Sequence, residues 1–262
     1  MTGLSGKTAI VTGGATSIGA AIVRALRGAG ANVAIADIDD ASGAVLAREL
    51  GPGALFQRCD ITNDAELDSL VAAVTRAFGG VDILVNNACT FLDNGLSSTR
   101  EEWLRSFNTN VASGALLLHR LVPTMKARGG GAVVNFSSIA GKFGQTSRAL
   151  YPVAKAAILQ LTRNEAMDLA PHKIRVNAIS PGWTWSATIE RLAKGDRKKA
   201  DRIGGEFHPL GRVGNAEDVA NAVLFLCSDA AQFITGVDLP VDGGYAMTGP
   251  DKGKPAMGRL AE

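Results

Sequence analysis

Ser138, Tyr151 and Lys155 are the side chains of this sequence best suited to moving a proton. They lie in the stretch Ser137 to Lys155, SSIAGKFGQTSRALYPVAK. Tyr151 and Lys155 are four residues apart, so on a helix they share a face. An ammonium about 5 Å from a phenol, at an effective dielectric of about 20, favours the phenolate by about 3 kcal/mol, or roughly two pKa units. This charge would bring Tyr151 toward the pH range in which a general base works best.

The segments that must position these groups alternate between strand and helix patterns. Apolar, β-rich runs occur at residues 8–11, 33–36, 54–58, 81–85, 132–136, 174–179 and 236–241. Helical patterns lie between most of them, at residues 20–26, 44–50, 64–78, 101–128, 153–170 and 217–227. This order predicts an α/β fold, a Rossmann-type doubly wound seven-stranded parallel sheet with helices on both faces.

Small and polar residues gather where these predicted strands end. They are Thr12–Gly13, Asp37, Cys59–Asp60, Asn86–Ala88, Ser137–Ser138 and Ser180–Gly182. Ligands of doubly wound sheets bind outside the carboxyl ends of the strands. We therefore expect the ligand site at this edge.

A glycine-rich turn, TGGATSIG at residues 12–19, follows the first strand. Alone it could be only a tight connection. With a second strand that ends at Asp37, the order is that of a dinucleotide-binding unit. Asp37 can accept hydrogen bonds from both ribose hydroxyls and would repel a 2′-phosphate, and no Arg or Lys lies in the turn or at residues 38–41. The sequence thus predicts NAD rather than NADP, although Asp37 could instead cap a helix.

Two further strand ends leave alternatives open. Asp60 could bind the adenine amino group or cap the next helix, where Thr62 and Asn63 compete for the cap. The adjacent amides Asn86 and Asn87 could bridge backbone segments beside a ligand or be purely structural.

Composition gives no support for several classes of protein. The 262 residues are 46% hydrophobic with a net charge of +2, which gives no argument for nucleic acid or acidic membranes. Three isolated cysteines and the absence of a signal or membrane-spanning stretch favour the cytoplasm. The scattered residues His119, His172 and His208 give no metal-ligand spacing, so we expect no metal.

These motifs together resemble the short-chain dehydrogenase/reductase family over about residues 6–245. The resemblance rests on TGGATSIG, Asp37, CD at 59–60, NNA at 86–88, Asn110, Ser138, YPVAK at 151–155, ISPG at 179–182 and VDGG at 241–244. It implies a catalytic tetrad of Asn110, Ser138, Tyr151 and Lys155. In such a site Ser138 holds the substrate oxygen, Lys155 also binds the nicotinamide ribose, and Asn110 secures a water that relays protons to Lys155.

The chain departs from the family pattern at two positions. Ser17 replaces the second turn glycine, and we expect its Cβ to be tolerated only with a negative φ. Cys89 replaces the glycine that usually follows NNA. We interpret Cys89 as a small wall residue rather than a nucleophile, because no basic partner lies beside it in the sequence.

The resemblance implies an NAD-dependent oxidoreductase that interconverts a small-molecule secondary alcohol and its ketone, with Tyr151 as base or acid. The alternatives are an NADPH-dependent ketoreductase, for example of 3-oxoacyl thioesters, and a non-catalytic dinucleotide sensor. A homotetramer built on the helices of residues 101–128 and 153–170 is also implied. The expected cofactor-binding residues are Gly13, Thr16, Ser17, Ile18, Gly19, Asp37, Asp60, Ile61, Asn87, Ala88, Tyr151, Lys155, Pro181, Gly182 and Thr184.

The substrate-selecting part is expected outside the tetrad. We expect one domain with a lid at about 183–212 and a loose tail after residue 245. Either Thr184 or Ser186 could add a hydroxyl at the nicotinamide. Trp183 and Trp185 could line the substrate pocket or pack the lid onto the body. Gln145, Arg148 and His208 are polar candidates near the pocket, and Arg148 could select a carboxylate or remain a solvated arginine.

Overall fold

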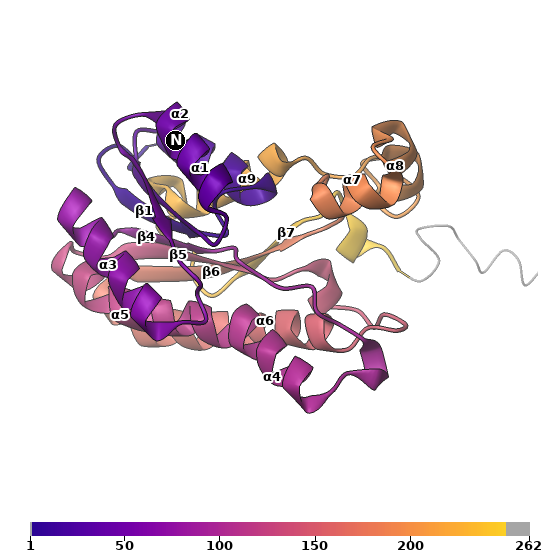
Figure 1. The fold of residues 1–262 in the computed structure, drawn as a ribbon. Coiled ribbons are helices and arrows are strands. Elements are labelled where there is room, and N and C mark those ends of the chain that lie inside the picture. Colours follow the sequence, from indigo (N-terminus) through magenta and orange to yellow (C-terminus); the bar gives the residue numbers. More distant parts are fainter. Residues whose placement is uncertain (1, 250–262) are drawn as a thin grey trace, which may run out of the picture.

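Seven parallel strands form one sheet in the order β3-β2-β1-β4-β5-β6-β7 (Figure 1). The computed structural model describes residues 2–249. Every strand predicted from the sequence is present, with its ends moved by a few residues at most. The bounds are β1 Thr8–Thr12, β2 Asn32–Asp37, β3 Ala54–Arg58, β4 Ile83–Asn86, β5 Gly131–Phe136, β6 Ile174–Pro181 and β7 Asp238–Val241.

Helices cover both faces of the sheet, because the central strands are apolar on both sides (Figure 1). One core joins the sheet to α1 (Ser17–Gly28), α2 (Asp40–Leu50) and α9 (Ala216–Cys227). The second core joins it to α3 (Asp64–Phe78), α5 (Ser113–Ala127) and α6 (Leu150–Leu169). The predicted Rossmann-type architecture is confirmed.

The helix expected over residues 101–128 is interrupted by a π-helical turn. The segment consists of α4 (Arg100–Phe107), the π turn Asn108–Ala112, and α5. A π turn carries an extra residue that shifts the backbone hydrogen bonds, and such turns are frequent at functional sites. This one contains Asn110.

The strand order reverses beside β1, which pairs with β2 on one side and with β4 on the other. Thr12 is in register with Ala36 and with Asn86, and Asn86 is in register with Asn135 of β5. The carboxyl ends of these strands therefore lie at one edge, where such sheets bind ligands.

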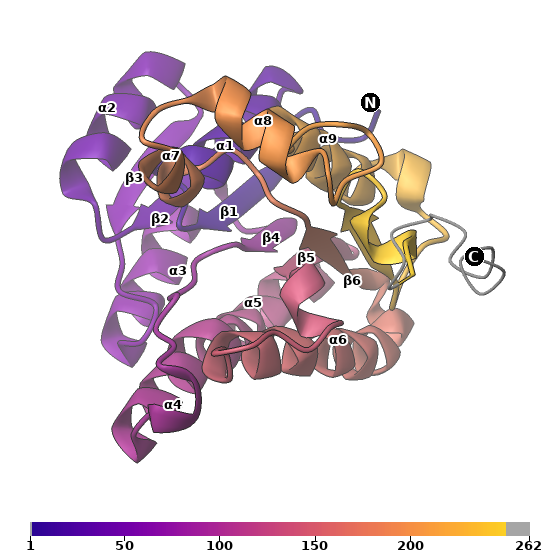
Figure 2. The same ribbon diagram turned by 90° about the vertical axis from the view of Figure 1, so that its right-hand side faces the viewer.

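The segment between β6 and α9 contains α7 (Ala187–Ala193) and α8 (Arg197–Gly204), which lie beyond this edge (Figure 2). Near the C-terminus, Tyr245–Met247 forms a helical turn, and Ala246 donates a hydrogen bond to Asp242. The tail expected after residue 245 lies mostly at residues 250–262, outside the described residues. Across residues 2–249, no helix has the length and apolar character needed to cross a membrane.

Candidate active site

A cleft of about 650 Å³ opens at the carboxyl edge of β1, β2, β3 and β4. Ten of the residues predicted to bind a cofactor line it. They are Gly13, Thr16, Ser17, Ile18, Gly19, Asp37, Asp60, Ile61, Asn87 and Ala88. The cleft also contains Cys89, Phe91 and Arg105, and Ser186 to Thr188 from the start of α7. The topology thus brings together side chains that are far apart in the sequence.

The N-terminus of α1 faces this cleft without a side-chain cap among the described residues. It also has no acidic residue in its first turn, in contrast to α2, α3 and α4. The turn before α1 is tight, because a Cβ at Gly19 would lie only 1.9 Å from the carbonyl oxygen of Gly13. Uncapped N–H groups at a helix start are suited to phosphate, so the turn fits a dinucleotide.

Ser17 contradicts the expected backbone conformation. Its φ is +48°, in the left-handed region, although the sequence predicted a negative φ. The tight turn therefore keeps the geometry that glycine would adopt there. A single non-glycine residue in this region costs on the order of 1 kcal/mol, which the surrounding turn must offset.

Asp37 accepts one backbone hydrogen bond on each carboxylate oxygen. Ala15 N–H donates to one oxygen at 2.9 Å and Asp39 N–H to the other at 3.1 Å. Asp39, not Asp37, caps α2. Each Asp37 oxygen keeps a further lone pair, and the carboxylate lines the cleft.

The side chains at two further strand ends, Asp60 and Asn87, also have defined hydrogen-bond partners. Asn63 caps α3, while Asp60 accepts hydrogen bonds from the N–H and the hydroxyl of Thr62. The side chain of Asn87 donates to the carbonyl oxygens of Thr12 and Gly13 at 3.0 and 2.8 Å. Asn87 thus bridges the end of β4 to the glycine turn.

Tyr151 and Lys155 lie on the same face of α6, as predicted. Lys155 Nζ is 5.4 Å from the centre of the Tyr151 ring and donates to the Phe136 carbonyl at 2.8 Å. Ser138 follows β5 and hydrogen-bonds to Tyr151, while its hydroxyl accepts from Ala140 N–H at 3.1 Å. The three groups that the sequence singled out are therefore in mutual reach.

Burial opposes ionisation in this pair. It raises the pKa of Tyr151, to which the nearby Cys89 also contributes, while the Ser138 hydrogen bond and the positive charge of Arg148 act in the lowering direction. Burial likewise lowers the pKa of Lys155, which is 3% exposed. The expected lowering of the Tyr151 pKa is thus absent in the protein alone, because loss of water outweighs the Ser138 hydrogen bond and the Arg148 charge.

Asn110 holds the segment that follows β4. Its Oδ1 accepts from Thr90 N–H at 2.9 Å, and its Nδ2 donates to the Thr90 carbonyl and to the Ser106 hydroxyl. Asn110 and Lys155 both line an internal cavity of about 10 Å³. Such a volume is about that of one water molecule.

A chain of buried polar groups continues from this cavity toward α6. Asn86 donates to Asn135 at 2.9 Å, and Asn135 donates to Glu165 at 2.8 Å. Asn86 Oδ1 is buried without a hydrogen-bond partner among the described residues and lines the cavity. Burial raises the pKa of Glu165 to about 7, although the Asn135 hydrogen bond acts in the lowering direction.

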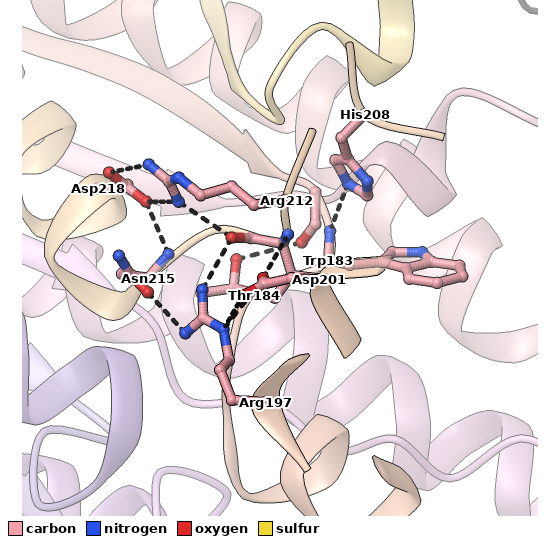
Figure 3. Close-up of polar contacts among 10 residues, drawn as sticks. Trp183, Thr184, Arg197, Asp201, His208, Arg212, Asn215 and Asp218 are labelled. Carbon is pink, nitrogen blue, oxygen red and sulfur yellow. Dashed lines mark hydrogen bonds and ion pairs between the residues drawn. The ribbon is translucent and has the colours of Figure 1, made fainter. Parts of the chain in front are cut away.

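The segment 183–212 folds over its own small core and is joined to the end of β6 through His208 (Figure 3). His208 is 1% exposed. Its Nε2 accepts from Trp183 N–H at 3.1 Å, and its Nδ1 lies 2.7 Å from the Gly204 carbonyl. Since a carbonyl only accepts, Nδ1 carries the proton and Nε2 is the acceptor.

The two lid tryptophans pack against this core of Ala193, Ala200 and Val213. The Arg197 guanidinium lies 5.3 Å from the Trp185 ring centre. Arg197 also pairs with Asp201 (Figure 3). Trp183 contacts Phe207 and His208 and borders a separate cavity of about 320 Å³. The contacts of Trp185 therefore support a role in packing the lid.

The residues expected against the nicotinamide lie where β6 ends. Pro181 is the last residue of β6, and a Cβ at Gly182 would lie 2.8 Å from His208 Nε2. The Thr184 hydroxyl donates to the Gly182 carbonyl and is buried, whereas Ser186 lines the cleft. Of the two candidate hydroxyls, Ser186 is the one at the cleft.

Gln145 and Arg148 both lie in the turn between β5 and α6. The Gln145 carbonyl accepts from Arg148 N–H. The Arg148 side chain pairs with Asp93 at 3.1 Å, and its guanidinium lies 5.2 Å from the centre of the Tyr151 ring. Asp93 was not singled out from the sequence, because Arg148 and the N–H groups of residues 149–151, which donate to it, are more than fifty residues away.

Among residues 2–249, no three His, Cys, Asp or Glu side chains gather as metal ligands. Ser138, Tyr151 and Lys155 lie near the cleft, which Cys89 and Phe91 also line.

Comparison with known proteins agrees with this geometry. A family model described as "Enoyl-(Acyl carrier protein) reductase" matches residues 13–246. The chain is 39% identical over 249 residues to a 2,5-dichloro-2,5-cyclohexadiene-1,4-diol dehydrogenase of Sphingobium indicum, covering 94% of this chain and 99% of that protein. It is 37% identical to a sorbitol dehydrogenase of Cereibacter sphaeroides, with coverage of 94% and 99%. It is 36% identical to a trans-4-hydroxycyclohexanecarboxylate dehydrogenase of Sinomonas cyclohexanicum, with coverage of 91% and 92%.

Proposed function

The chain belongs to the short-chain dehydrogenase/reductase family and is an oxidoreductase of alcohols and ketones, and we propose that it oxidises a secondary alcohol with NAD. The observation that carries the choice of cofactor is the Asp37 carboxylate in the cleft. Both of its oxygens are held by backbone N–H groups, so the charge is fixed in position. A ribose diol can donate to such a carboxylate, whereas a 2′-phosphate would be repelled.

The tetrad supplies the proton chemistry of this proposal. The Tyr151 phenolate takes the proton of the alcohol, while Ser138 holds the same oxygen. Lys155 favours the phenolate through its charge. When bound, oxidised NAD would supply the hydride acceptor, and before the transfer its positive charge would offset the cost that burial places on the phenolate.

A proton path away from Tyr151 completes the proposal. The cavity between Lys155 and Asn110 is suited to one water, and Asn86 Oδ1 offers that water an acceptor. Asn110 contributes by holding the π turn and Thr90 rather than through a free side-chain amide. The proton received by Tyr151 would leave through this water.

The substrate class that we propose is a cyclic secondary alcohol or a polyol of similar size. Two of the similar dehydrogenases act on six-membered carbocycles and one acts on sorbitol. Phe91 is 58% exposed, lines the cleft and stacks on Tyr151 with ring centres 5.1 Å apart. It gives the proton acceptor a flat apolar neighbour on which a carbocycle can pack.

The test is NADH absorbance with cyclohexane-1,4-diol, trans-4-hydroxycyclohexanecarboxylate and sorbitol, each with NAD and with NADP. We expect turnover of at least one alcohol, with kcat/KM for NAD roughly a hundredfold above that for NADP. Faster reduction of a 3-oxoacyl thioester with NADPH would favour the ketoreductase instead. Cofactor binding without any turnover of alcohols or ketones would favour a dinucleotide sensor.

We also propose a homotetramer in the cytoplasm, composed of single-domain subunits with a lid at 183–212. The proposed interface is the outer side of α4, α5 and α6, where Leu104, Leu116, Val153 and Met167 are exposed. The three cysteines are free thiols, as is usual in a reducing compartment.

A further inference from the structure

The first turn of α6, which carries Tyr151, is capped by a carboxylate from a distant segment. Ala149, at the N-cap position, has no side-chain cap of its own. The Asp93 carboxylate instead accepts from the N–H groups of Ala149, Leu150 and Tyr151 at 2.9 to 3.2 Å. Pro152 has no N–H to donate, so the start of the helix is satisfied by Asp93.

Asp93 is held as an anion. Burial alone would raise its pKa, but the backbone N–H groups of Ala149, Gly95, Tyr151 and Leu150 outweigh this and hold the pKa below its usual value. The side chain is 2% exposed. A buried anion at the positive end of a helix is favourable, and this one ties the segment after β4 to the catalytic helix.

The same carboxylate also fixes a second cation beside the phenol. Arg148 Nε donates to Asp93 Oδ2 at 3.1 Å. In this position the guanidinium carbon is 5.2 Å from the Tyr151 ring centre, a distance close to the 5.4 Å of Lys155 Nζ. The phenol therefore has two cations as neighbours, one from its own helix and one held by Asp93.

We propose that Asp93 and Arg148 are positioning residues for the proton transfer: Asp93 anchors the start of α6 and holds Arg148 where its charge favours the Tyr151 phenolate. This inference rests on the proposed role of Tyr151. The pairing of Arg148 Nε with Asp93 argues against the hypothesis that Arg148 selects substrate carboxylates.

Four titratable groups face Tyr151 from the elements around it. Lys155 lies on the same helix, Arg148 in the preceding turn, and Cys89 and Asp93 on the segment after β4. Of these, Cys89 opposes the phenolate while Arg148 favours it. Removal of the Arg148 charge should therefore raise the pKa of the phenol.

The phenol can be titrated without any substrate, because the chain has only two tyrosines, Tyr151 and Tyr245. The Tyr245→Phe protein labelled with 3,5-difluorotyrosine has one fluorinated phenol, whose pKa is read by ¹⁹F NMR. In this background we would compare Arg148→Gln, Arg148→Lys and Asp93→Asn, and the double variant of Asp93→Asn with Arg148→Gln. Arg76→Gln, an exposed arginine on α3, is the matched control.

We expect Arg148→Gln to raise the phenol pKa by about half a unit to one unit, since exposure and pairing reduce the full effect of a charge at this distance. Arg148→Lys should restore most of the shift, and Arg76→Gln should leave the pKa unchanged. In the Asp93→Asn background, Arg148→Gln should shift the pKa by less than about 0.2 units, because the guanidinium is no longer held.

An unchanged pKa in Arg148→Gln would overturn the proposal, as would an equal shift with and without Asp93. If Asp93→Asn does not fold, the comparison of Arg148→Gln with Arg148→Lys decides, since a purely structural arginine would not move the phenol pKa. Because the titration needs no turnover, its failure is separate from a failure of the proposed dehydrogenase activity.

Discussion

At the residue scale, the choice of cofactor rests on one carboxylate. Asp37 lies at the end of β2 and lines the cleft. Each of its carboxylate oxygens accepts one backbone hydrogen bond and keeps a lone pair for a ligand. Hydrogen bonds to a charged acceptor contribute about 1.5–3 kcal/mol each. A single substitution that removes the charge should therefore change the cofactor preference.

We predict that Asp37→Asn lowers kcat/KM for NAD by roughly tenfold to a hundredfold and narrows the gap to NADP. Asp40→Asn is the matched control, because it removes the same charge from the exposed first turn of α2. Initial rates at varied NAD and NADP measure both effects. Equal losses for the two cofactors in Asp37→Asn would contradict the assigned role.

The buried carboxyl of Glu165 leads to a prediction about how the stability of the protein depends on pH. Its pKa in the folded protein is about 7, against 4.5 for the free side chain. The folded state therefore binds more protons than the unfolded chain between about pH 4.5 and 7, so the free energy of unfolding falls as pH rises through this range. Above pH 7 the carboxylate is ionised, and its burial lowers the free energy of unfolding.

Glu165→Gln should remove this pH dependence, because the amide can still accept from Asn135 without a charge. We expect the variant to gain about 1–3 kcal/mol relative to the parent at pH 8, and to show little difference at pH 5. Urea unfolding at the two pH values measures it. Asp168→Asn, at an exposed position of the same helix, should show no such change.

At the element scale, the lid is joined to the sheet by His208. The ring accepts from Trp183 N–H (Figure 3). It also donates to the Gly204 carbonyl and packs against the backbone of Gly182. It thus links α8 to the end of β6, where the proposed nicotinamide contacts lie. Loss of the link should loosen cofactor binding more than it harms the tetrad.

His208→Phe keeps a ring of similar size but leaves the Trp183 N–H without its acceptor. The Gly204 carbonyl loses the ring donor and keeps the backbone N–H groups of Phe207 and His208. We predict a several-fold rise in KM for NAD and a loss of about 1–3 kcal/mol in the free energy of unfolding. His208→Gln, which keeps an acceptor, should recover part of both. His172→Phe, at an exposed turn, is the control; a normal KM for NAD in His208→Phe would exclude the link as a cofactor-positioning element.

Helices α7 and α8 were not predicted from the sequence, but the seven strands and the helices that alternate with them were, because each strand is a short apolar run and these helices carry apolar residues at helical spacing. The π turn at Asn108–Ala112 was not, since nothing in the residue pattern of 101–128 marks an inserted residue. The positive φ of Ser17 was also missed, because the shape of the turn rather than the preference of serine sets that angle.

At the scale of the whole molecule, the sequence predicted those site residues that lie within one short motif. Tyr151 and Lys155 lie one helical turn apart, and Asp37 ends a recognisable strand. Asp93 could not be found in this way, because its partners at residues 149–151 come from a different segment. These partners are backbone N–H groups, which do not depend on the type of side chain. The role of Arg148 depends on that contact.

The proposed tetramer is also a property of the whole molecule. We predict that light scattering at micromolar concentration gives the mass of four chains, because a stable interface needs the exposed apolar residues of α4, α5 and α6 to be covered. Met167→Glu on α6 should weaken the assembly, whereas Val45→Glu on the opposite face should not. A monomeric mass for the unsubstituted protein would contradict the proposal.

The central claim, that Tyr151 is the base of an NAD-dependent alcohol oxidation, is tested most directly by Tyr151→Phe. The measurement is NADH formation from the best alcohol of the panel, together with the Kd for NAD. We predict that kcat/KM falls by roughly 10²–10⁴-fold while the Kd for NAD changes by less than about threefold. Retention of more than about a tenth of the turnover, with NAD still bound, would contradict it.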